Sequence, residues 1–251
     1  MDTGKSIRLS HIFRSDGKTV IAALDHGISG MASLSALEHP MSLIPELVES
    51  GVDAILTTAG IIQICPQMIG RVGIILRVDG GPSAMTGEWD KMKIILTVED
   101  ALRIGADAVI MMGIAGDKGE SDSLANLGSM AAECSRWGMP LIAEMLPRGL
   151  TASDVSIQDI QIAARLGAEL GADIIKIRYQ GPAEAYGPVI SSCYIPLVIL
   201  GGSKQSPEKL MADVADAMSV GARGVAVGRN IWQAPRPGDI VSGLVEVVHN
   251  R

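Results

Sequence analysis

The stretch Gly171-Ala172-Asp173-Ile174-Ile175-Lys176-Ile177 places a lysine inside a short hydrophobic run. A run of this length, rich in isoleucine and opened by a Gly-Ala-Asp turn, predicts a buried strand. A lysine in such a strand either extends its ammonium group to water or stays desolvated. Desolvation disfavours the ammonium form, and the neutral amine attacks carbonyl carbons. Lys176 is therefore either a strand-end lysine that reaches solvent or a carboxylate, or a catalytic nucleophile.

Short apolar runs like this one recur along the chain and alternate with longer segments of helical periodicity. The eight predicted strands are Val20–Leu24, Ala54–Thr57, Ile74–Val78, Ala108–Met112, Leu141–Met145, Ile174–Ile177, Leu197–Leu200 and Gly224–Val227. They begin about 29 residues apart on average, which is the length of one strand, one helix and two loops. Eight such units predict a parallel sheet that closes into a (β/α)8 TIM barrel.

A repeated turn supports this count, because a glycine-led triplet comes just before four of the strands. The triplets are Gly51-Val52-Asp53, Gly105-Ala106-Asp107, Gly171-Ala172-Asp173 and Gly221-Ala222-Arg223. Glycine after a helix supplies a left-handed C-cap and a tight turn into the sheet. No linker interrupts the pattern, so we expect a single α/β domain over residues 1–251. The alternative is a doubly wound open sheet, whose usual Gly-x-Gly-x-x-Gly turn is here Asp25-His26-Gly27.

Composition argues against several classes of protein. The chain has a net charge of −7 and only one Phe, three Trp and three Tyr, which does not fit a nucleic-acid binder that stacks bases and tracks phosphates. Cys65, Cys134 and Cys193 form no Cys-x-x-Cys pair and the histidines have no metal-ligand spacing, so we expect neither disulfides nor a metal site. With no signal segment or membrane-spanning run, we expect a cytoplasmic protein without a membrane partner.

The last two strand ends predict a phosphate site. In a barrel, chemistry gathers where strands end and the following loops begin. Gly201 and Gly202 follow the seventh predicted strand, and Gly228 and Arg229 follow the eighth. Glycines let backbone N–H groups approach an anion, and an arginine clamps phosphate oxygens with two hydrogen bonds. These four residues therefore predict phosphate binding, although glycines at such positions also serve tight turns.

Two carboxylates are candidates for proton transfer. Asp25 closes the first strand and is followed by His26, and a carboxylate there acts as a general base or caps the next helix. Glu144 shares one face of the fifth strand with Ile142, and the fifth strand lies beside the sixth in a barrel. If that face is the interior, Glu144 approaches Lys176 and either shuttles protons or holds the ammonium group in a salt bridge.

Sequence patterns at the strand ends suggest a family. They are Leu24-Asp25-His26-Gly27, Pro147-Arg148-Gly149, Ile175-Lys176, Gly201-Gly202 and Val227-Gly228-Arg229-Asn230-Ile231-Trp232-Gln233. Together they resemble the archaeal-type (DhnA-type) class I fructose-bisphosphate aldolases, a branch of the DeoC/LacD aldolase superfamily, over nearly the whole chain. By that resemblance Gly27 and Arg148 join the predicted substrate-binding residues.

The resemblance implies a barrel in which Lys176 forms a Schiff base with a small phosphorylated ketose such as fructose 1,6-bisphosphate. The protonated imine accepts electrons as the neighbouring carbon–carbon bond breaks, and Asp25 handles protons. Relatives of this kind are lyases that use no metal and no other cofactor, and they assemble as homo-oligomers, often decamers. We expect the same of this chain, with a phosphorylated ketose or aldehyde as its small-molecule partner.

The sequence departs from the family pattern close to the chemistry. Leu146 stands where the aldolases have a tyrosine proton donor, Glu144 where they have a tryptophan, and Leu200 where a serine is usual. After the lysine, Ile177-Arg178-Tyr179-Gln180-Gly181 replaces a common Thr-Tyr-Tyr-Thr-Gly. Glu144, Tyr179 and His26 are the candidates to replace the missing acid.

These departures leave two alternatives to a simple aldolase open. One is a transferase on the same scaffold, similar to the aminodeoxyheptulosonate synthases or to the thiolase-like relative that moves an acetyl group from a phosphorylated pentane-dione to coenzyme A. The other is a phosphosugar-binding barrel without catalysis. A required second substrate would indicate the transferase, and binding without covalent capture would indicate the binding barrel.

Overall fold

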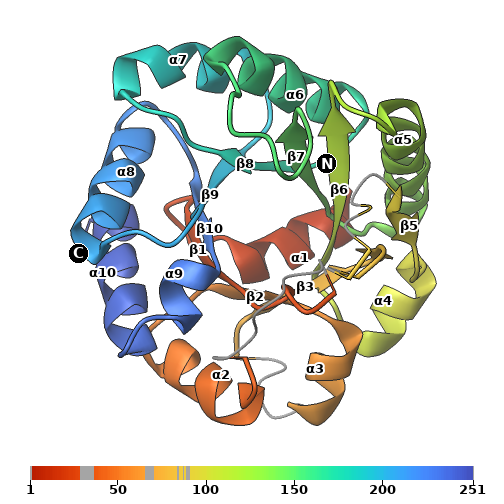
Figure 1. The fold of residues 1–251 in the computed structure, drawn as a ribbon. Coiled ribbons are helices and arrows are strands. Elements are labelled where there is room, and N and C mark those ends of the chain that lie inside the picture. The colour runs from red at the N-terminus through yellow and green to blue at the C-terminus, as the bar shows by residue number, and fades with distance from the viewer. Residues whose placement is uncertain are drawn as a thin grey trace.

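The structure, a computed structural model, describes residues 2–28, 37–65, 71–83, 85–86, 88 and 91–250. Within them, eight parallel strands close into a barrel in the order β1-β10-β9-β8-β7-β6-β3-β2, and helices surround it (Figure 1). The barrel strands are β1 (Thr19–Ala23), β2 (Ala54–Thr57), β3 (Gly73–Arg77), β6 (Ala108–Ala115), β7 (Leu141–Pro147), β8 (Ile174–Arg178), β9 (Leu197–Leu200) and β10 (Gly224–Val227). The predicted (β/α)8 barrel is confirmed.

The strand bounds also follow the sequence closely. β2, β9 and β10 have the predicted bounds, whereas β6 and β7 continue past theirs to Ala115 and Pro147. The two strands stay paired up to that point, where Ala115 is the register partner of Pro147. Pairing with a neighbour therefore extends both strands through glycine and proline, which are weak strand formers by themselves.

The described helices lie outside the barrel, apart from α1 at one end. Their bounds are α1 (Thr3–Ile12), α2 (Pro40–Glu49), α3 (Ala59–Ile64), α4 (Val98–Ile104), α5 (Glu120–Trp137), α6 (Ile157–Glu169), α7 (Ala183–Ser192), α8 (Pro207–Ser219), α9 (Arg229–Trp232) and α10 (Pro237–His249). Two short strands, β4 (Asp79–Gly80) and β5 (Lys93–Ile94), pair antiparallel in a sheet of their own. No helix in the described part of the chain is long and apolar enough to cross a membrane.

The four glycine-led turns adopt the predicted geometry. Gly51, Gly105, Gly171 and Gly221 have φ angles of 93°, 87°, 96° and 105°, a left-handed conformation that favours glycine. Each turn joins the end of a helix to the start of a barrel strand at the same end of the barrel. Loops at this end are therefore short, and the opposite end is left for longer loops.

Helix α1 and the residues that follow it close the short-loop end. Three aspartates of the glycine-led turns receive side-chain partners from this segment: Lys5 Nζ lies 2.8 Å from Asp173 Oδ2, His11 Nδ1 lies 2.7 Å from Asp107 Oδ1, and Arg14 pairs with Asp53. Ile12 is fully buried and packs into a hydrophobic cluster of interior barrel side chains. The cluster fills the barrel interior at the short-loop end. In the described part of the chain, a ligand can therefore enter only at the carboxyl ends of the strands.

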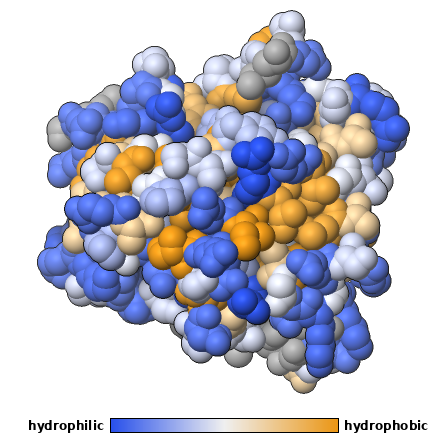
Figure 2. Space-filling model, turned by 90° about the horizontal axis from the view of Figure 1, so that it is seen from above, coloured by the Kyte–Doolittle hydropathy of each residue, from blue (hydrophilic) through white to orange (hydrophobic). Residues whose placement is uncertain are grey.

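One outer face carries exposed hydrophobic side chains. Figure 2 views the molecule from above Figure 1, the side on which α6 and α7 lie, and shows hydrophobic residues gathered among charged ones. Ile162 on α6 and Tyr194 after α7 are 51% and 60% exposed. The predicted homo-oligomer stays a prediction.

Candidate active site

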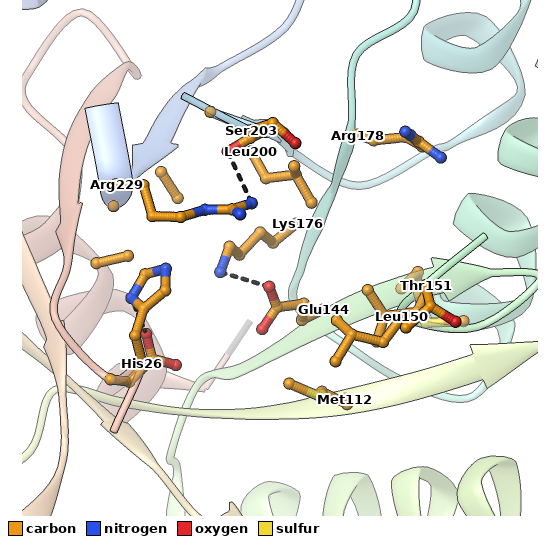
Figure 3. A pocket seen from close by; sticks show the side chains of 18 of the residues that line it. His26, Met112, Glu144, Leu150, Thr151, Lys176, Arg178, Leu200, Ser203 and Arg229 are labelled. Carbon is orange, nitrogen blue, oxygen red and sulfur yellow. Dashed lines mark hydrogen bonds and ion pairs between the residues drawn. The ribbon is translucent and has the colours of Figure 1, made fainter. Parts of the chain in front are cut away.

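The carboxyl ends of the barrel strands surround a cavity of about 560 Å³. Eight of the ten predicted site residues line it, namely Asp25, His26, Glu144, Lys176, Gly201, Gly202, Gly228 and Arg229. They come from distant parts of the sequence: β7, β8 and the loops after β1, β9 and β10. Closure of the barrel therefore brings together the residues that the strand-end patterns predicted (Figure 3).

Lys176 and Glu144 form the centre of the cavity floor. They are register partners on β8 and β7, and Nζ lies 2.6 Å from Oε1. Lys176 is 5% exposed and Glu144 is 8% exposed. The face shared by Ile142 and Glu144 is thus the interior one, and the carboxylate holds the lysine head group in a buried salt bridge.

Arg77, which the sequence analysis missed, lies on the other side of Glu144. Its guanidinium group donates from Nε to Asp25 Oδ2 (2.7 Å), from Nη1 to Asp79 Oδ1 (3.0 Å) and from Nη2 to Glu144 Oε2. The side chain is 1% exposed. One buried cation therefore connects both carboxylates that were predicted to transfer protons, together with a third.

Asp79 anchors this cluster to the barrel wall. While Oδ1 accepts from Arg77, Oδ2 accepts a hydrogen bond from the backbone N–H of Met112 on β6 (2.8 Å). The signal for both residues was present in the sequence, because Arg77 and Asp79 are charged residues at the end of the buried run Ile74–Val78. A charged residue in a predicted buried strand indicates a functional role at Lys176, and it indicates one at Arg77 for the same reason.

The cluster fixes the charge of Glu144 and Arg77. Burial by itself would raise the pKa of Glu144, but the charges of Lys176 and Arg77 and their hydrogen bonds outweigh burial and hold that pKa well below its usual range. Burial would lower the pKa of Arg77, and the surrounding carboxylates Asp25, Glu144 and Asp79 raise it well above normal instead. At neutral pH Glu144 is a carboxylate and Arg77 a guanidinium ion.

His26 is the neutral group of the site. Burial lowers the pKa of its imidazole, an effect that the nearby Asp25 carboxylate opposes and the charge of Lys176 adds to. Nδ1 is buried without a hydrogen-bond partner and lies 3.8 Å from Asp25 Oδ1. The ring packs edge-to-face on Trp232, with 5.2 Å between centroids. At neutral pH His26 is therefore an uncharged imidazole with one ring nitrogen unprotonated.

The loops after β9 and β10 form one wall of the cavity. Arg229 donates from Nη2 to the Gly202 carbonyl (3.1 Å), and the buried Asn230 side chain donates to the carbonyls of Gly201 (2.8 Å) and Ser203 (3.1 Å). Gly202 has a φ angle of 66°, so glycine is needed there for backbone reasons. The two loops are thereby held against each other with a guanidinium group at their edge.

Glycine at position 228 is required by a close approach. A Cβ atom added at Gly228 would collide with the imidazole ring of His26. The absence of a side chain at Gly228 therefore lets the first strand's histidine sit against the last strand's loop.

Two predicted substrate-binding residues lie outside the cavity lining, and their role stays a prediction. Gly27 and Arg148 do not line the cavity. Arg148 has a positive φ of 62° directly after β7, and its side chain is 55% exposed and pairs with Asp159 on α6, Nη2 to Oδ1, at 3.0 Å. The turn at Arg148 directs the side chain outward, where the carboxylate of α6 neutralises it.

Tyr179, a candidate for the replacement acid, also lies outside the cavity lining. Its hydroxyl group donates to Asp216 on α8 (3.4 Å), its ring packs on Tyr186, and it does not line the cavity. Burial raises its pKa to about 12, with further contributions from Asp216. Tyr179 follows the interior-facing Arg178 by one residue, so strand periodicity turns it outward.

Among the described residues, no group of three or more His, Cys, Asp or Glu is arranged to hold a metal ion. The buried acidic residues Asp25, Asp79 and Glu144 surround Arg77. Their shared partner is a side chain of the protein.

Comparison with known proteins places the chain in a family. A profile described as DeoC/LacD family aldolase matches residues 19–234. The chain belongs to this family. This aldolase-family chain is 34% identical over 247 residues to 2-amino-3,7-dideoxy-D-threo-hept-6-ulosonate synthase 1 of Archaeoglobus fulgidus, covering 98% of this chain and 91% of the relative. It is 32% identical to 2-amino-4,5-dihydroxy-6-oxo-7-(phosphonooxy)heptanoate synthase of Streptomyces griseus, covering 98% and 90%.

Solved structures agree with the family assignment. A structure of an archaeal fructose-1,6-bisphosphate aldolase, with its catalytic lysine covalently bound to the carbinolamine intermediate of the substrate, has a TM-score of 0.85 and 25% identity to this aldolase-family chain. The match covers 98% of this chain and 99% of the other. The resemblance that the strand-end motifs predicted is therefore confirmed.

Proposed function

We propose that this chain catalyses aldol chemistry on a small phosphorylated ketose through a Schiff base on Lys176. The observation that carries the proposal is the position of the lysine: its buried Nζ contacts Glu144 and faces a cavity whose wall is formed by Arg229 and its glycine-rich loops. A nucleophilic amine, a proton acceptor and an anion-binding wall are the three parts that such a reaction needs.

The first half of the reaction is imine formation. The Lys176 ammonium group loses a proton, the amine adds to the keto carbon, and the resulting carbinolamine loses water to leave an iminium ion. The neutral His26 is the acceptor that we assign to the first proton. Glu144 stays ionised beside Nζ and is the counter-charge for the iminium ion.

The second half is cleavage. A base removes the proton from the hydroxyl group on the distal carbon of the bond that breaks, the bonding electrons move to the iminium ion, and an aldehyde leaves. Protonation of the remaining enamine and addition of water release the second product and the free amine. Asp25 is the proposed base, because its carboxylate lies buried at the cavity floor and is oriented by Arg77.

The phosphate of the substrate is proposed to lie against the loops after β9 and β10. Arg229 already uses one N–H group to hold Gly202, which leaves the rest of its guanidinium group for an anion. The glycines Gly201, Gly202 and Gly228 add a surface without side chains. The Gly201 N–H group already donates to the Ala226 carbonyl (3.1 Å), so the backbone N–H groups proposed to meet phosphate oxygens are those of Gly202 and Gly228.

A transferase reaction is the second candidate, and two observations favour it. The curated relatives are synthases, and Leu146 supplies no proton donor in the place of the aldolase tyrosine. In this reaction the enamine on Lys176 attacks a second aldehyde instead of taking a proton from the protein. A thiolase-type variant would use coenzyme A as the acceptor.

The test of the Schiff base is reductive trapping. Protein is mixed with dihydroxyacetone phosphate and sodium borohydride, and the intact mass and modified peptide are measured. A reduced adduct on Lys176 supports the proposal. No adduct with several ketose phosphates would instead favour a binding barrel without catalysis.

Turnover assays then separate the two reactions. Cleavage of fructose 1,6-bisphosphate alone, measured by the aldehyde released, indicates the lyase. Turnover that appears only when an aldehyde or coenzyme A is added indicates the transferase. Because the proposed chemistry uses only protein groups, EDTA should leave either activity unchanged.

A further inference from the structure

Arg178 is a second arginine of the cavity wall, and the reaction proposed above assigns it no role. It is the last residue of β8 and follows Lys176 by two positions, so both side chains are on the same face of the strand. Both line the cavity. Arg178 therefore lies one layer of side chains above the nucleophile, towards the mouth of the barrel.

In the described part of the chain, no carboxylate pairs with this guanidinium group. Arg178 makes no ion pair with any residue that the structure describes, and its one side-chain hydrogen bond runs from Nη1 to the backbone carbonyl of Ala152 (3.3 Å). Arg148, which follows β7, is paired with Asp159, and the buried Arg77 contacts three carboxylates. Arg178 differs from them in having donors left for a ligand.

The surroundings of Arg178 strengthen its attraction for an anion. Leu200 is its register partner on β9, and Leu146 lines the same cavity from the end of β7. Hydrocarbon beside this half-buried guanidinium group lowers the local dielectric constant and strengthens its attraction for an anion. Thr151 and Ser153, which also line the cavity, place two hydroxyl groups in the loop that Arg178 contacts through Ala152.

Arg178 and Arg229 lie on different sides of the nucleophile. Figure 3 shows Arg229 and His26 on one side of Lys176, and Arg178 with Thr151 on the other. A substrate whose phosphate is at Arg229 and whose keto carbon is at Lys176 therefore extends its remaining carbons towards Arg178.

We propose that Arg178 is a specificity-determining residue that binds an acidic group, carboxylate or phosphate, on the aldehyde half of the substrate. The inference rests on the proposed Schiff-base function. In the cleavage direction this half leaves as the aldehyde, and in the synthetic direction it is the acceptor of the enamine. The electron and proton transfers are those already given, and Arg178 only orients the reactant.

The test compares acidic and neutral aldehydes as acceptors of dihydroxyacetone phosphate. Glyceraldehyde 3-phosphate, succinic semialdehyde and glyceraldehyde supply a phosphate, a carboxylate and no charge, respectively. The wild type should prefer one acidic aldehyde, and which one it prefers identifies the anion. Arg178→Gln should lower kcat/KM for that aldehyde by about 10- to 100-fold through KM, the effect of losing a charged hydrogen bond, and leave glyceraldehyde within about twofold.

Two controls make the result specific. Arg165→Gln makes the same change at an arginine of α6 that pairs with Glu169 and does not line the cavity, and it should leave the preference unchanged. Arg178→Lys should retain part of the preference, because it keeps the charge but not the planar fork. The inference would be overturned if Arg178→Gln lowered activity equally with all three aldehydes, or if it lowered activity with none of them.

Borohydride trapping separates this inference from the proposed function. Arg178→Gln should form the dihydroxyacetone phosphate adduct on Lys176 as readily as the wild type, because that half of the substrate does not reach Arg178. A wild type that forms no adduct would overturn both proposals. A wild type that forms the adduct but shows no preference for acidic aldehydes would overturn the role of Arg178 alone.

Discussion

Lys176 and Glu144 face each other across two neighbouring strands of the barrel, with Nζ 2.6 Å from Oε1 and both side chains buried. Since Arg77 donates to the other oxygen of Glu144, the carboxylate lies between two cations. The carboxylate holds the lysine head group in a buried ion pair. In the proposed mechanism the same carboxylate is the counter-charge for the iminium ion.

Replacing the proposed nucleophile tests the covalent step. Lys176→Met should abolish turnover and the borohydride adduct while leaving affinity for inorganic phosphate largely intact, because the loops after β9 and β10 do not depend on the amine. Turnover is measured with the preferred substrate and phosphate affinity by calorimetry. Turnover at the parental rate would refute the imine mechanism.

The phosphate wall has its own test. Arg229→Ala should raise KM for the phosphorylated substrate by an amount equivalent to about 1.5–3 kcal/mol, the range for a hydrogen bond to a charged group. Ser219→Ala, which alters a hydrogen bond on the surface of α8, is the matched control for a change outside the cavity. An unchanged KM in Arg229→Ala would place the phosphate elsewhere.

Arg77 should matter for folding as well as for activity. Arg77→Met leaves three carboxylates without their shared cation, and removing one partner of a buried ion pair costs about 3–5 kcal/mol of unfolding free energy. Arg14→Met, at the opposite end of the barrel and partly exposed, is the comparison and should cost less. Urea denaturation measures both; equal losses would mean that Arg77 is no more critical than a peripheral pair.

The stability of the protein should depend on Glu144 at acid pH. Its pKa in the folded state is held below the ordinary value of 4.5, so its contribution to stability is present above pH 4.5 and is lost as pH falls towards the folded-state pKa. Urea midpoints of the wild type should fall over this interval. Glu144→Gln should be less stable at pH 7 and show a shallower fall, and parallel curves would contradict the assignment.

Much of the fold was accessible from local sequence. The glycine-led turns before β2, β6, β8 and β10 gave the period of the barrel, because a left-handed turn after a helix is a requirement of a few adjacent residues. The extensions of β6 and β7 to Ala115 and Pro147 were not accessible, since they depend on pairing between two strands and not on the propensity of either.

The active-site residues also differ in how far local sequence predicted them. A lysine in a hydrophobic run marked Lys176, and glycines with an arginine after the last strand marked the Arg229 wall. A motif also marked Arg148, yet a left-handed backbone conformation after β7 and the carboxylate of Asp159 place that side chain outside. A residue's type and neighbours in sequence therefore suggested a role, but the direction of the side chain decided whether it could perform it.

The sequence by itself determined eight strands, their order along the chain and a buried lysine on the sixth, because strand length, turn chemistry and alternation of side chains are local properties. Only the tertiary structure decided that Arg77 joins Asp25, Asp79 and Glu144, and that Arg178 faces the cavity without a carboxylate. The two-residue period of a strand determines which side chains share a face. Closure of the barrel determines which of the two faces is the interior one, and closure depends on pairing between distant segments.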